Sequence, residues 1–287
     1  MTKIEPRVDG RAAGEVTART IEVAAGPSAV AVLRVGAGRP LLYLHGLCDV
    51  HSAWPGSEPT PFVAGLAERF DVAAPALPGY SGGAPVSALH DMEDYVFHLT
   101  DLLGGLGWEQ VDVVGHSLGG WLAAELALRR PERVARLALL SPLGLHVAGV
   151  EVPPVFGALA PRGIGGFGES RRLLFADAEG EAALRVLPDG MAEADQLRWF
   201  TGLAGAARLG WKAPHFQSRR LAERLHRITV PTLLVVGEQD VLVPETAARA
   251  WVEGLAAADL FEVPDAGHCL TLEWPEGASE VAAYLWR

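Results

Sequence analysis

Cysteine is scarce in this sequence of 287 residues, which contains only Cys48 and Cys269. Two distant cysteines form no disulfide framework, and their number and separation fit neither a zinc site nor a redox pair. We therefore predict two free thiols. Each is expected to act as a small apolar filler, and a thiol that modulates activity is the alternative.

Long apolar runs and an excess of positive charge are also missing. No segment approaches the roughly 18 consecutive apolar residues of a membrane span, and the first residues lack the apolar stretch of a secretory signal. A cytoplasmic protein without a membrane partner is therefore expected. The formal net charge of −11 argues against nucleic acid as a partner, because non-specific binding needs clustered Lys and Arg.

The chain has the composition of a folded domain, with 49% hydrophobic and 21% charged residues. Residues 15–35 alternate apolar and polar side chains around Gly26-Pro27 and predict an antiparallel hairpin. Beyond them, short apolar runs alternate with helix-like stretches, which predicts an α/β protein with a mostly parallel sheet covered on both faces. The runs are residues 41–44, 72–74, 111–114, 137–140, 233–236 and 260–263.

This alternation stops between residues 142 and 227, where no comparable strand run occurs. The stretch is too long for a plain loop, so we interpret it as a mostly helical insertion. Residues 179–186 and 192–209 carry apolar side chains at helical spacing, separated by a turn at Asp189-Gly190. The insertion is either a second structural layer or a lid over a pocket.

Residues 111–120 have the pattern of a strand that runs directly into a helix, with Gly-x-Ser-x-Gly at the turn. Such a sharp turn strains its central residue and needs small residues two positions before and after it. Gly115 and Gly119 meet this need, so Ser117 is predicted to stand exposed at the end of the strand as a nucleophile. The alternative is a serine that only caps the helix.

Four motifs give the chain a resemblance to the α/β-hydrolase fold, in the branch that carries a helical cap. They are Leu44-His45-Gly46, residues 77–82, the turn at 115–119, and residues 237–240 with Ala266-Gly267-His268. The resemblance implies a mostly parallel eight-stranded sheet flanked by helices. It also implies a core of residues 1–142 and 228–287, with a helical cap of residues 143–227 inserted after the sixth strand.

A serine nucleophile needs a base, and the base needs a carboxylate that fixes its tautomer. His268 follows the last apolar run, in a loop where functional residues of parallel sheets gather; a surface histidine is the alternative. The resemblance implies Asp240 as the acid, since Ser117, Asp240, His268 is the chain order of this fold. Glu238 and Asp265 are nearby rivals.

The same resemblance assigns the backbone N–H groups of Leu47 and Leu118 to the oxyanion hole, and neither residue is a proline. It also implies an elbow and pocket wall formed by His45, Gly46, Gly115, His116 and Gly119. The insertion is rich in aromatic residues, which favours a pocket for an apolar acyl or aryl group. These residues are Phe156, Phe167, Phe175, Trp199, Phe200, Trp211 and Phe216.

A serine in place of an aspartate at the elbow excludes the chemistry of haloalkane dehalogenases and epoxide hydrolases. The leading hypothesis is hydrolysis of a small or medium apolar carboxylic ester through an acyl-enzyme. Carbon–carbon hydrolases of ring-fission products are an alternative. Their base is usually followed by Trp and their elbow usually reads Gly-Asn-Ser-Met-Gly, whereas this chain has Cys269 and Gly-His-Ser-Leu-Gly.

Two further alternatives remain. A prolyl or amide hydrolase would need acidic residues in the cap to hold a substrate amine, and the cap offers Glu169, Asp177, Glu179, Glu181, Asp189, Glu193 and Asp195. A ligand receptor without turnover is disfavoured by the complete set of nucleophile, acid and base. No metal, nucleotide or flavin motif is present, so no cofactor is expected, and a small molecule is the expected partner.

Overall fold

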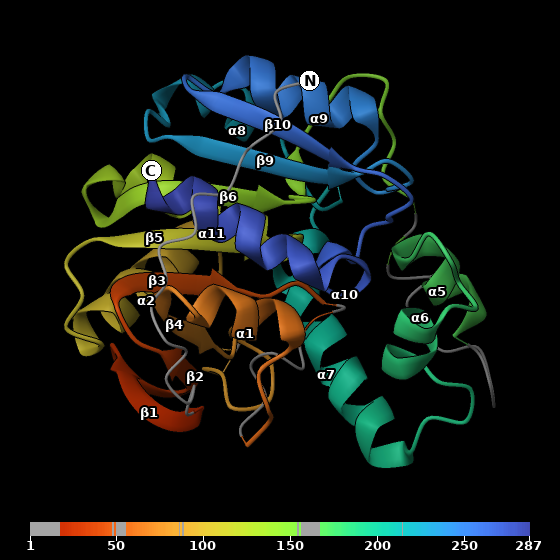
Figure 1. Cartoon of the computed structure of the whole chain (residues 1–287), viewed down its shortest axis with the longest axis horizontal. Helices are drawn as coiled ribbons and strands as arrows, with labels where there is room; N and C mark the ends of the chain where they lie inside the picture. The colour runs from red at the N-terminus through yellow and green to blue at the C-terminus, as the bar shows by residue number, and fades with distance from the viewer. Residues whose placement is uncertain are drawn as a thin grey trace.

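The computed structural model describes residues 18–47, 49, 56–85, 87, 89–153, 155, 167–213 and 215–287. Its centre is an eight-stranded sheet with the strand order β1-β2-β4-β3-β5-β6-β9-β10 (Figure 1). In chain order these strands are β1 (Arg19–Ala25), β2 (Ser28–Gly36), β3 (Arg39–Leu44), β4 (Phe70–Pro75), β5 (Val111–His116), β6 (Val134–Leu140), β9 (Thr232–Gly237) and β10 (Ala258–Val263). The predicted eight-stranded sheet is confirmed.

The direction in which each strand pairs agrees with its pattern of apolar and polar side chains. β1 and β2 pair antiparallel around a turn at Gly26, and β2 also pairs antiparallel with β4. All other neighbours are parallel. β1 lies at the edge and alternates exposed with buried residues along its second half, whereas every residue of β5 and β9 is buried. The apolar runs of β5 and β9 are therefore strands covered on both faces, whereas the run at residues 260–263 lies in the edge strand β10, in which only Val263 is buried.

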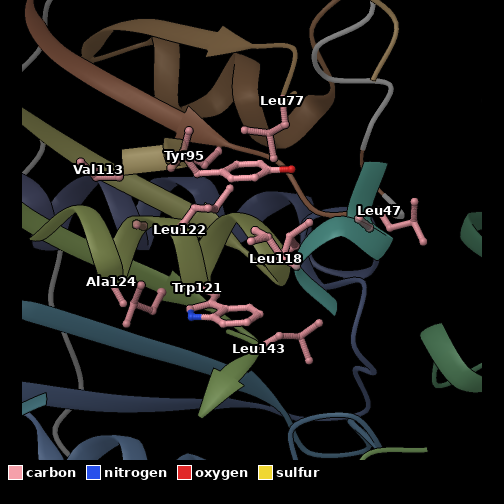
Figure 2. Close-up of a cluster of buried hydrophobic side chains, with 14 of the residues drawn as sticks. Leu47, Leu77, Tyr95, Val113, Leu118, Trp121, Leu122, Ala124 and Leu143 are labelled. Carbon is pink, nitrogen blue, oxygen red and sulfur yellow. The ribbon is translucent and has the colours of Figure 1, made fainter. Parts of the chain in front are cut away.

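Helices cover the two faces of the sheet and create two apolar cores. One face packs against α1 (Pro61–Ala67) and α11 (Ala278–Trp286), with α10 (Leu270–Glu273) and the 3-10 turn η5 (Pro275–Gly277) beside them. The other packs against α2 (Met92–Gly105), α3 (Leu118–Arg129) and α9 (Glu245–Gly254). Figure 2 shows part of this second core, around Trp121 and Leu122 of α3. A 3-10 turn, η3 (Pro131–Arg133), leads from α3 into β6.

Between β6 and β9 the chain forms α5 (Gly168–Leu174), α6 (Glu181–Val186), α7 (Glu193–Gly210), α8 (Arg219–Ala222) and the 3-10 turn η4 (Leu225–Arg227). Of these, α5, α6 and α7 lie beyond the end towards which the parallel strands point, whereas α8 lies away from that end (Figure 1). α6 and α7 confirm the two predicted helical segments. The limits of the cap at residues 143 and 227 stay a prediction.

The insertion also contains strands that the sequence pattern did not indicate. β7 (Gly144–Leu145) and β8 (Gln217–Ser218) pair as a small parallel sheet near its two ends. Strands of two residues are too short to show a period of two, which explains the omission. Arg171 of α5 ties the helices together, because its buried guanidinium donates to the carbonyl of Leu187 at 2.9 Å and to Asp189 at 2.9 Å. Among the described helices, none has the length and apolar character needed to cross a membrane.

Candidate active site

Ser117 occupies the turn between β5 and α3, with φ 55° and ψ −115°. A non-glycine residue in this left-handed region is strained, as a sharp strand-to-helix turn requires. The backbone N–H of Ser117 donates to the carbonyl of Leu140 at 2.9 Å, and its own carbonyl accepts from Trp121 and Leu143 at 3.1 Å each. The hydroxyl makes no capping hydrogen bond to α3, which contradicts the helix-cap alternative.

Gly115 and Gly119 let the elbow approach the neighbouring backbone closely. A Cβ atom on Gly119 would lie 2.0 Å from the carbonyl oxygen of Leu44, and one on Gly115 would lie 2.4 Å from the carbonyl oxygen of Gly119. Both contacts are with backbone atoms, which cannot swing aside as a flexible side chain can. The two glycines are therefore required by contact distance.

Gly119→Ala is expected to lower the free energy of unfolding by about 2 to 3 kcal/mol, because the added methyl group overpacks a rigid site. Gly104→Ala is the matched control, since this exposed glycine of α2 has nothing within 4 Å of the new methyl group. Alanine at that position is expected to be neutral or to stabilise by up to about 1 kcal/mol. Urea unfolding of both variants measures the difference, and equal stabilities would contradict the packing argument.

The structure brings Ser117, His268 and Asp240 into one hydrogen-bonded chain. Nε2 of His268 lies 2.7 Å from Oγ of Ser117, and Nδ1 lies 2.9 Å from Oδ2 of Asp240. Oδ1 of Asp240 accepts the N–H groups of Leu242 at 2.8 Å and Val243 at 3.0 Å. Burial acts to raise the pKa of Asp240, but His268 and the backbone donor of Val243 outweigh it and lower that pKa overall, so the acid is held as a carboxylate.

The alternatives to this chain do not fit the geometry. His268 is 1% exposed, so it is not a surface histidine. Glu238 and Asp265 are exposed, and Asp265 accepts a hydrogen bond from Gln239 at 3.3 Å. Ser117 is itself only 4% exposed, which corrects the expectation that it stands exposed. The side chain of Ser117 is covered by the other residues that line the cavity in front of it.

Among the described residues, the cavity in front of Ser117 and His268 is lined otherwise by apolar side chains. Its lining comprises Leu47, Ser117, Leu118, Leu143, Val155, Leu174, Ala206, Phe216, Leu242 and His268. Its volume is about 20 Å³, roughly the room that one water molecule needs. Leu47 and Leu118 both border it, as expected of residues that would donate to an oxyanion next to Ser117. Leu118 begins α3, where a backbone N–H has no partner within the helix.

Aromatic side chains contribute less to this cavity than the sequence indicated. Phe216 is the one member of the predicted aromatic set among its described lining residues. Phe167, Phe175 and Trp199 are buried by packing elsewhere in the insertion. Phe200 and Trp211 are 42% and 63% exposed. Phe156 lies outside the described residues.

His45 and His116 lie behind Ser117 and do not contribute to the described lining, in contrast to the predicted pocket wall. The same holds for Gly46, Gly115 and Gly119, which bring the backbone segments around Ser117 together. His45 donates from Nδ1 to the carbonyl of Gly46 at 2.8 Å and accepts at Nε2 from the N–H of Leu77 at 3.1 Å. Burial lowers the pKa of His45, so a neutral ring holds these two loops.

Two acidic residues near the site, Asp49 and Glu273, were not predicted from the sequence. Asp49 is fully buried, and its Oδ1 accepts the N–H of Gly46 at 2.5 Å. Glu273 accepts the N–H groups of Ala176 at 2.8 Å and Gly267 at 3.0 Å, which joins the loop before His268 to the cap. Burial is the main cause that raises the pKa of Glu273. Asp49 could have been noticed in the sequence, because it is an acidic residue three positions after Gly46 of the His45-Gly46 motif. No comparable pattern marks Glu273.

Cys269 follows His268 directly, and the expectation of a free thiol there is wrong. Its side chain is fully buried and disulfide-bonded. Its backbone N–H donates to the carbonyl of Leu174 in α5 at 2.9 Å. The loop that carries His268 is thus fixed to the cap by a backbone hydrogen bond as well as through Glu273. Cys48 lies outside the described residues.

Comparison with known proteins identifies the family of this chain. A family model described as "Alpha/beta hydrolase family" matches residues 41–283. The 2-hydroxymuconate semialdehyde hydrolase of Pseudomonas sp. strain CF600 is 30% identical over 259 residues, 83% of each chain. The pimeloyl-[acyl-carrier protein] methyl ester esterase of Nitrosomonas europaea is 29% identical over 251 residues, 84% of this chain and 93% of that one.

Among solved structures, the 2-hydroxy-6-oxo-6-phenylhexa-2,4-dienoate hydrolase of Rhodococcus sp. strain RHA1 superimposes with a TM-score of 0.74 and 22% identity. The match covers 95% of this chain and all of that one. At this level of identity the structural match supports the fold alone. The family model, in contrast, matches most of the chain, and the relative from Pseudomonas matches 83% of it. The chain therefore belongs to the alpha/beta hydrolase family, and it is a hydrolase.

Proposed function

We propose that this hydrolase cleaves small or medium apolar carboxylic esters through an acyl-enzyme on Ser117. The observation that carries the proposal is the hydrogen-bonded chain of Ser117, His268 and Asp240 at an otherwise apolar cavity. A hydroxyl next to an imidazole, which is next to a carboxylate, is the arrangement of an activated nucleophile.

The proposed reaction has two halves. Oγ of Ser117 attacks the ester carbonyl while Nε2 of His268 takes the hydroxyl proton, and the backbone N–H groups of Leu47 and Leu118 stabilise the oxyanion. When the tetrahedral intermediate collapses, the C–O bond breaks and the alcohol leaves with the proton from His268. Water then attacks the acyl-enzyme with the same base, which releases the acid and restores Ser117. Asp240 stabilises the imidazolium in both halves.

The lining of the cavity supports a neutral, apolar acyl group. None of its described side chains is an acid, lysine or arginine. The volume of about 20 Å³ supports a short acyl chain, or movement of Leu174 and Ala206, which belong to the cap helices α5 and α7. The cap would then act as the lid over the pocket. A small-molecule partner is part of the same proposal. The cytoplasmic location expected from the sequence is not, because disulfides such as that of Cys269 are rare in the cytosol.

Carbon–carbon hydrolysis is the second candidate, because the chain resembles the 2-hydroxymuconate semialdehyde hydrolase from Pseudomonas and a solved meta-cleavage product hydrolase. The dienoate in the name of the Rhodococcus hydrolase is a carboxylate. A buried carboxylate needs a cation or several donors, and the described lining of the cavity contains no arginine or lysine. This difference favours the ester.

Hydrolysis of amides next to a bound amine has less support. Of the seven acidic residues considered in the cap, none lines the described cavity. Glu179 and Asp189 instead contact Arg171 at 3.1 and 2.9 Å. A receptor without turnover has no use for an intact catalytic chain, so we do not favour it.

One assay distinguishes these functions. The purified protein is given the p-nitrophenyl esters of acetate, butyrate and octanoate, a 2-hydroxy-6-oxo-dienoate, and a prolyl p-nitroanilide. Turnover fastest on an ester supports the proposal, with kcat/KM at least about tenfold above the other substrates. Preference for the dienoate would replace it with carbon–carbon hydrolysis. Turnover of none of them, with a rise in Tm on adding a ligand, would favour a receptor.

Phe216→Ala is expected to shift the preference of the enzyme towards longer acyl chains. Phe216 lines the cavity at Ser117 and also a neighbouring one between β7, β8 and α9. Truncating its ring would connect the two. The ratio of octanoate to acetate turnover is expected to rise at least about fivefold, since each added buried methylene is worth about 0.8 kcal/mol. This ratio is independent of the folded fraction.

Phe200→Ala is the control for this prediction, because Phe200 is an exposed phenylalanine of the same insertion. Its chain-length profile is expected to match that of the parent enzyme. An unchanged profile in Phe216→Ala would show that the second cavity does not receive the acyl chain.

A further inference from the structure

Asp49 and His116, which the proposed mechanism does not use, form a second acid–histidine pair behind Ser117. Oδ1 of Asp49 lies 3.1 Å from Nδ1 of His116, and both side chains are 0% exposed. The His116 ring lies close to the ring of His268, with 5.6 Å between centroids. A buried charged pair this close to a nucleophile needs an explanation beyond packing, because apolar residues would fill the space at lower cost.

Both ring nitrogens of His116 face oxygen atoms that accept hydrogen bonds. Nε2 lies 2.7 Å from the carbonyl oxygen of His268, and Nδ1 faces the carboxylate of Asp49. The carboxylate is itself an acceptor on both oxygens, from the N–H of Gly46 and the hydroxyl of Tyr43. A neutral imidazole has a single N–H. One of its two ring nitrogens would therefore direct a lone pair at an oxygen lone pair, which is unfavourable. The imidazolium has an N–H on both nitrogens: Nε2 donates to the carbonyl, and the positive charge forms an ion pair with Asp49, to which the N–H of Nδ1 is not aligned for a hydrogen bond.

The surroundings stabilise both charges. Burial acts to raise the pKa of Asp49, but His116 and the hydroxyl of Tyr43 outweigh it and bring that pKa to about 2. Burial also acts to lower the pKa of His116, and Asp49 with the His268 carbonyl outweighs it and raises that pKa overall. The other titratable groups near the pair, among the described residues, are His45, Tyr80, His268 and Asp240.

The pair joins the three segments that carry the proposed catalytic groups. Asp49 holds the N–H of Gly46, which precedes Leu47; His116 precedes Ser117 and contacts the carbonyl of His268. We propose that His116 is a permanent cation and that, with Asp49, it positions the oxyanion donor Leu47 and the base His268 relative to Ser117. The kinetic part of this inference rests on the proposed function; the charge state of His116 does not.

The charge state is tested by ¹⁵N NMR of the wild-type protein with labelled histidine, with the signals of His116 assigned by their loss in His116→Asn. Both ring nitrogens of His116 are expected to carry protons at pH 7, where an ordinary histidine is mostly neutral. A single protonated nitrogen at pH 7 would overturn the proposal. This measurement needs no turnover and no variant that must remain active.

The positioning role is tested with Asp49→Asn, His116→Asn and the double variant. Each single change is expected to lower kcat on p-nitrophenyl butyrate about 10- to 100-fold with KM changed less than about twofold, because displacement of catalytic groups by about 1 Å costs rate rather than binding. The double variant is expected to retain at least the kcat of the less active single variant, because the two residues act as one unit. Asparagine at position 116 places its amide near the position of Nδ1, facing Asp49, and has neither the Nε2 donor to the His268 carbonyl nor a charge.

Matched controls are Asp112→Asn and His98→Asn, a buried acid paired with Arg39 and a buried histidine of α2. Both are expected to keep the kcat of the wild type. The rate at which a fluorophosphonate, losing fluoride, phosphonylates Ser117 is measured in parallel. It is expected to fall with kcat in the pair variants, and it separates failure of this inference from failure of the ester proposal. Unchanged kcat and phosphonylation in folded His116→Asn would refute the positioning role.

Discussion

Replacing Ser117 by alanine is expected to lower the turnover of p-nitrophenyl butyrate by at least about three orders of magnitude, the usual contribution of a nucleophile in such a triad. The substitution removes one oxygen atom, which Nε2 of His268 contacts at 2.7 Å. It leaves the cavity and both proposed oxyanion donors in place. Loss of rate with a preserved fold would therefore assign the covalent step to this hydroxyl.

The measurement combines steady-state kinetics with covalent labelling. A fluorophosphonate is expected to add one phosphonyl group to the wild type and none to Ser117→Ala, as read by mass spectrometry. Ser170→Ala is the control, because Ser170 is a fully buried serine of α5 that does not line the described cavity. Turnover in Ser117→Ala within tenfold of the wild type would exclude the acyl-enzyme mechanism.

The strands that are marked by apolar runs, and the site residues that are marked by their position in the chain, could be predicted from the sequence. The apolar runs marked the central strands because strands buried on both faces need unbroken apolar segments, as in β5 and β9. The elbow could be predicted because close backbone approach restricts positions 115 and 119 to glycine. Asp240 was placed by its position after a strand, and the structure brings it to His268.

What the sequence did not indicate depends on three-dimensional proximity. The contact between Asp49 and His116 joins a loop residue to the last residue of β5, and no local pattern marks it. The burial of Ser117 depends on the insertion, whose short strands β7 and β8 have no detectable period. Cys269 has no framework of cysteine spacing that would reveal its disulfide. The residues that surround and position the catalytic groups were therefore harder to predict than the catalytic groups themselves.

Asp240→Asn is expected to lower kcat about 10⁴-fold, as a wrong histidine tautomer does in serine triads. In this protein the hydrogen bonds of Oδ1 to the N–H groups of Leu242 and Val243 fix which way the amide must face. The asparagine oxygen would keep those two donors, and its NH₂ group would point at Nδ1 of His268. The ring would then carry its proton on Nε2, facing Ser117, and could no longer accept the hydroxyl proton.

The rival acids supply the control for this prediction. Glu238→Gln and Asp265→Asn are isosteric changes at exposed positions in the neighbouring loops, and both are expected to keep kcat within about twofold, as surface changes usually do. Fluorophosphonate labelling of Asp240→Asn is expected to be slow but complete, because its serine remains. ¹⁵N NMR of labelled histidine provides a readout that does not depend on rate, since the protonated nitrogen of His268 should change from Nδ1 to Nε2. Full activity in Asp240→Asn would show that another group orients His268, and the order Ser117, Asp240, His268 would then describe the fold without describing the catalyst.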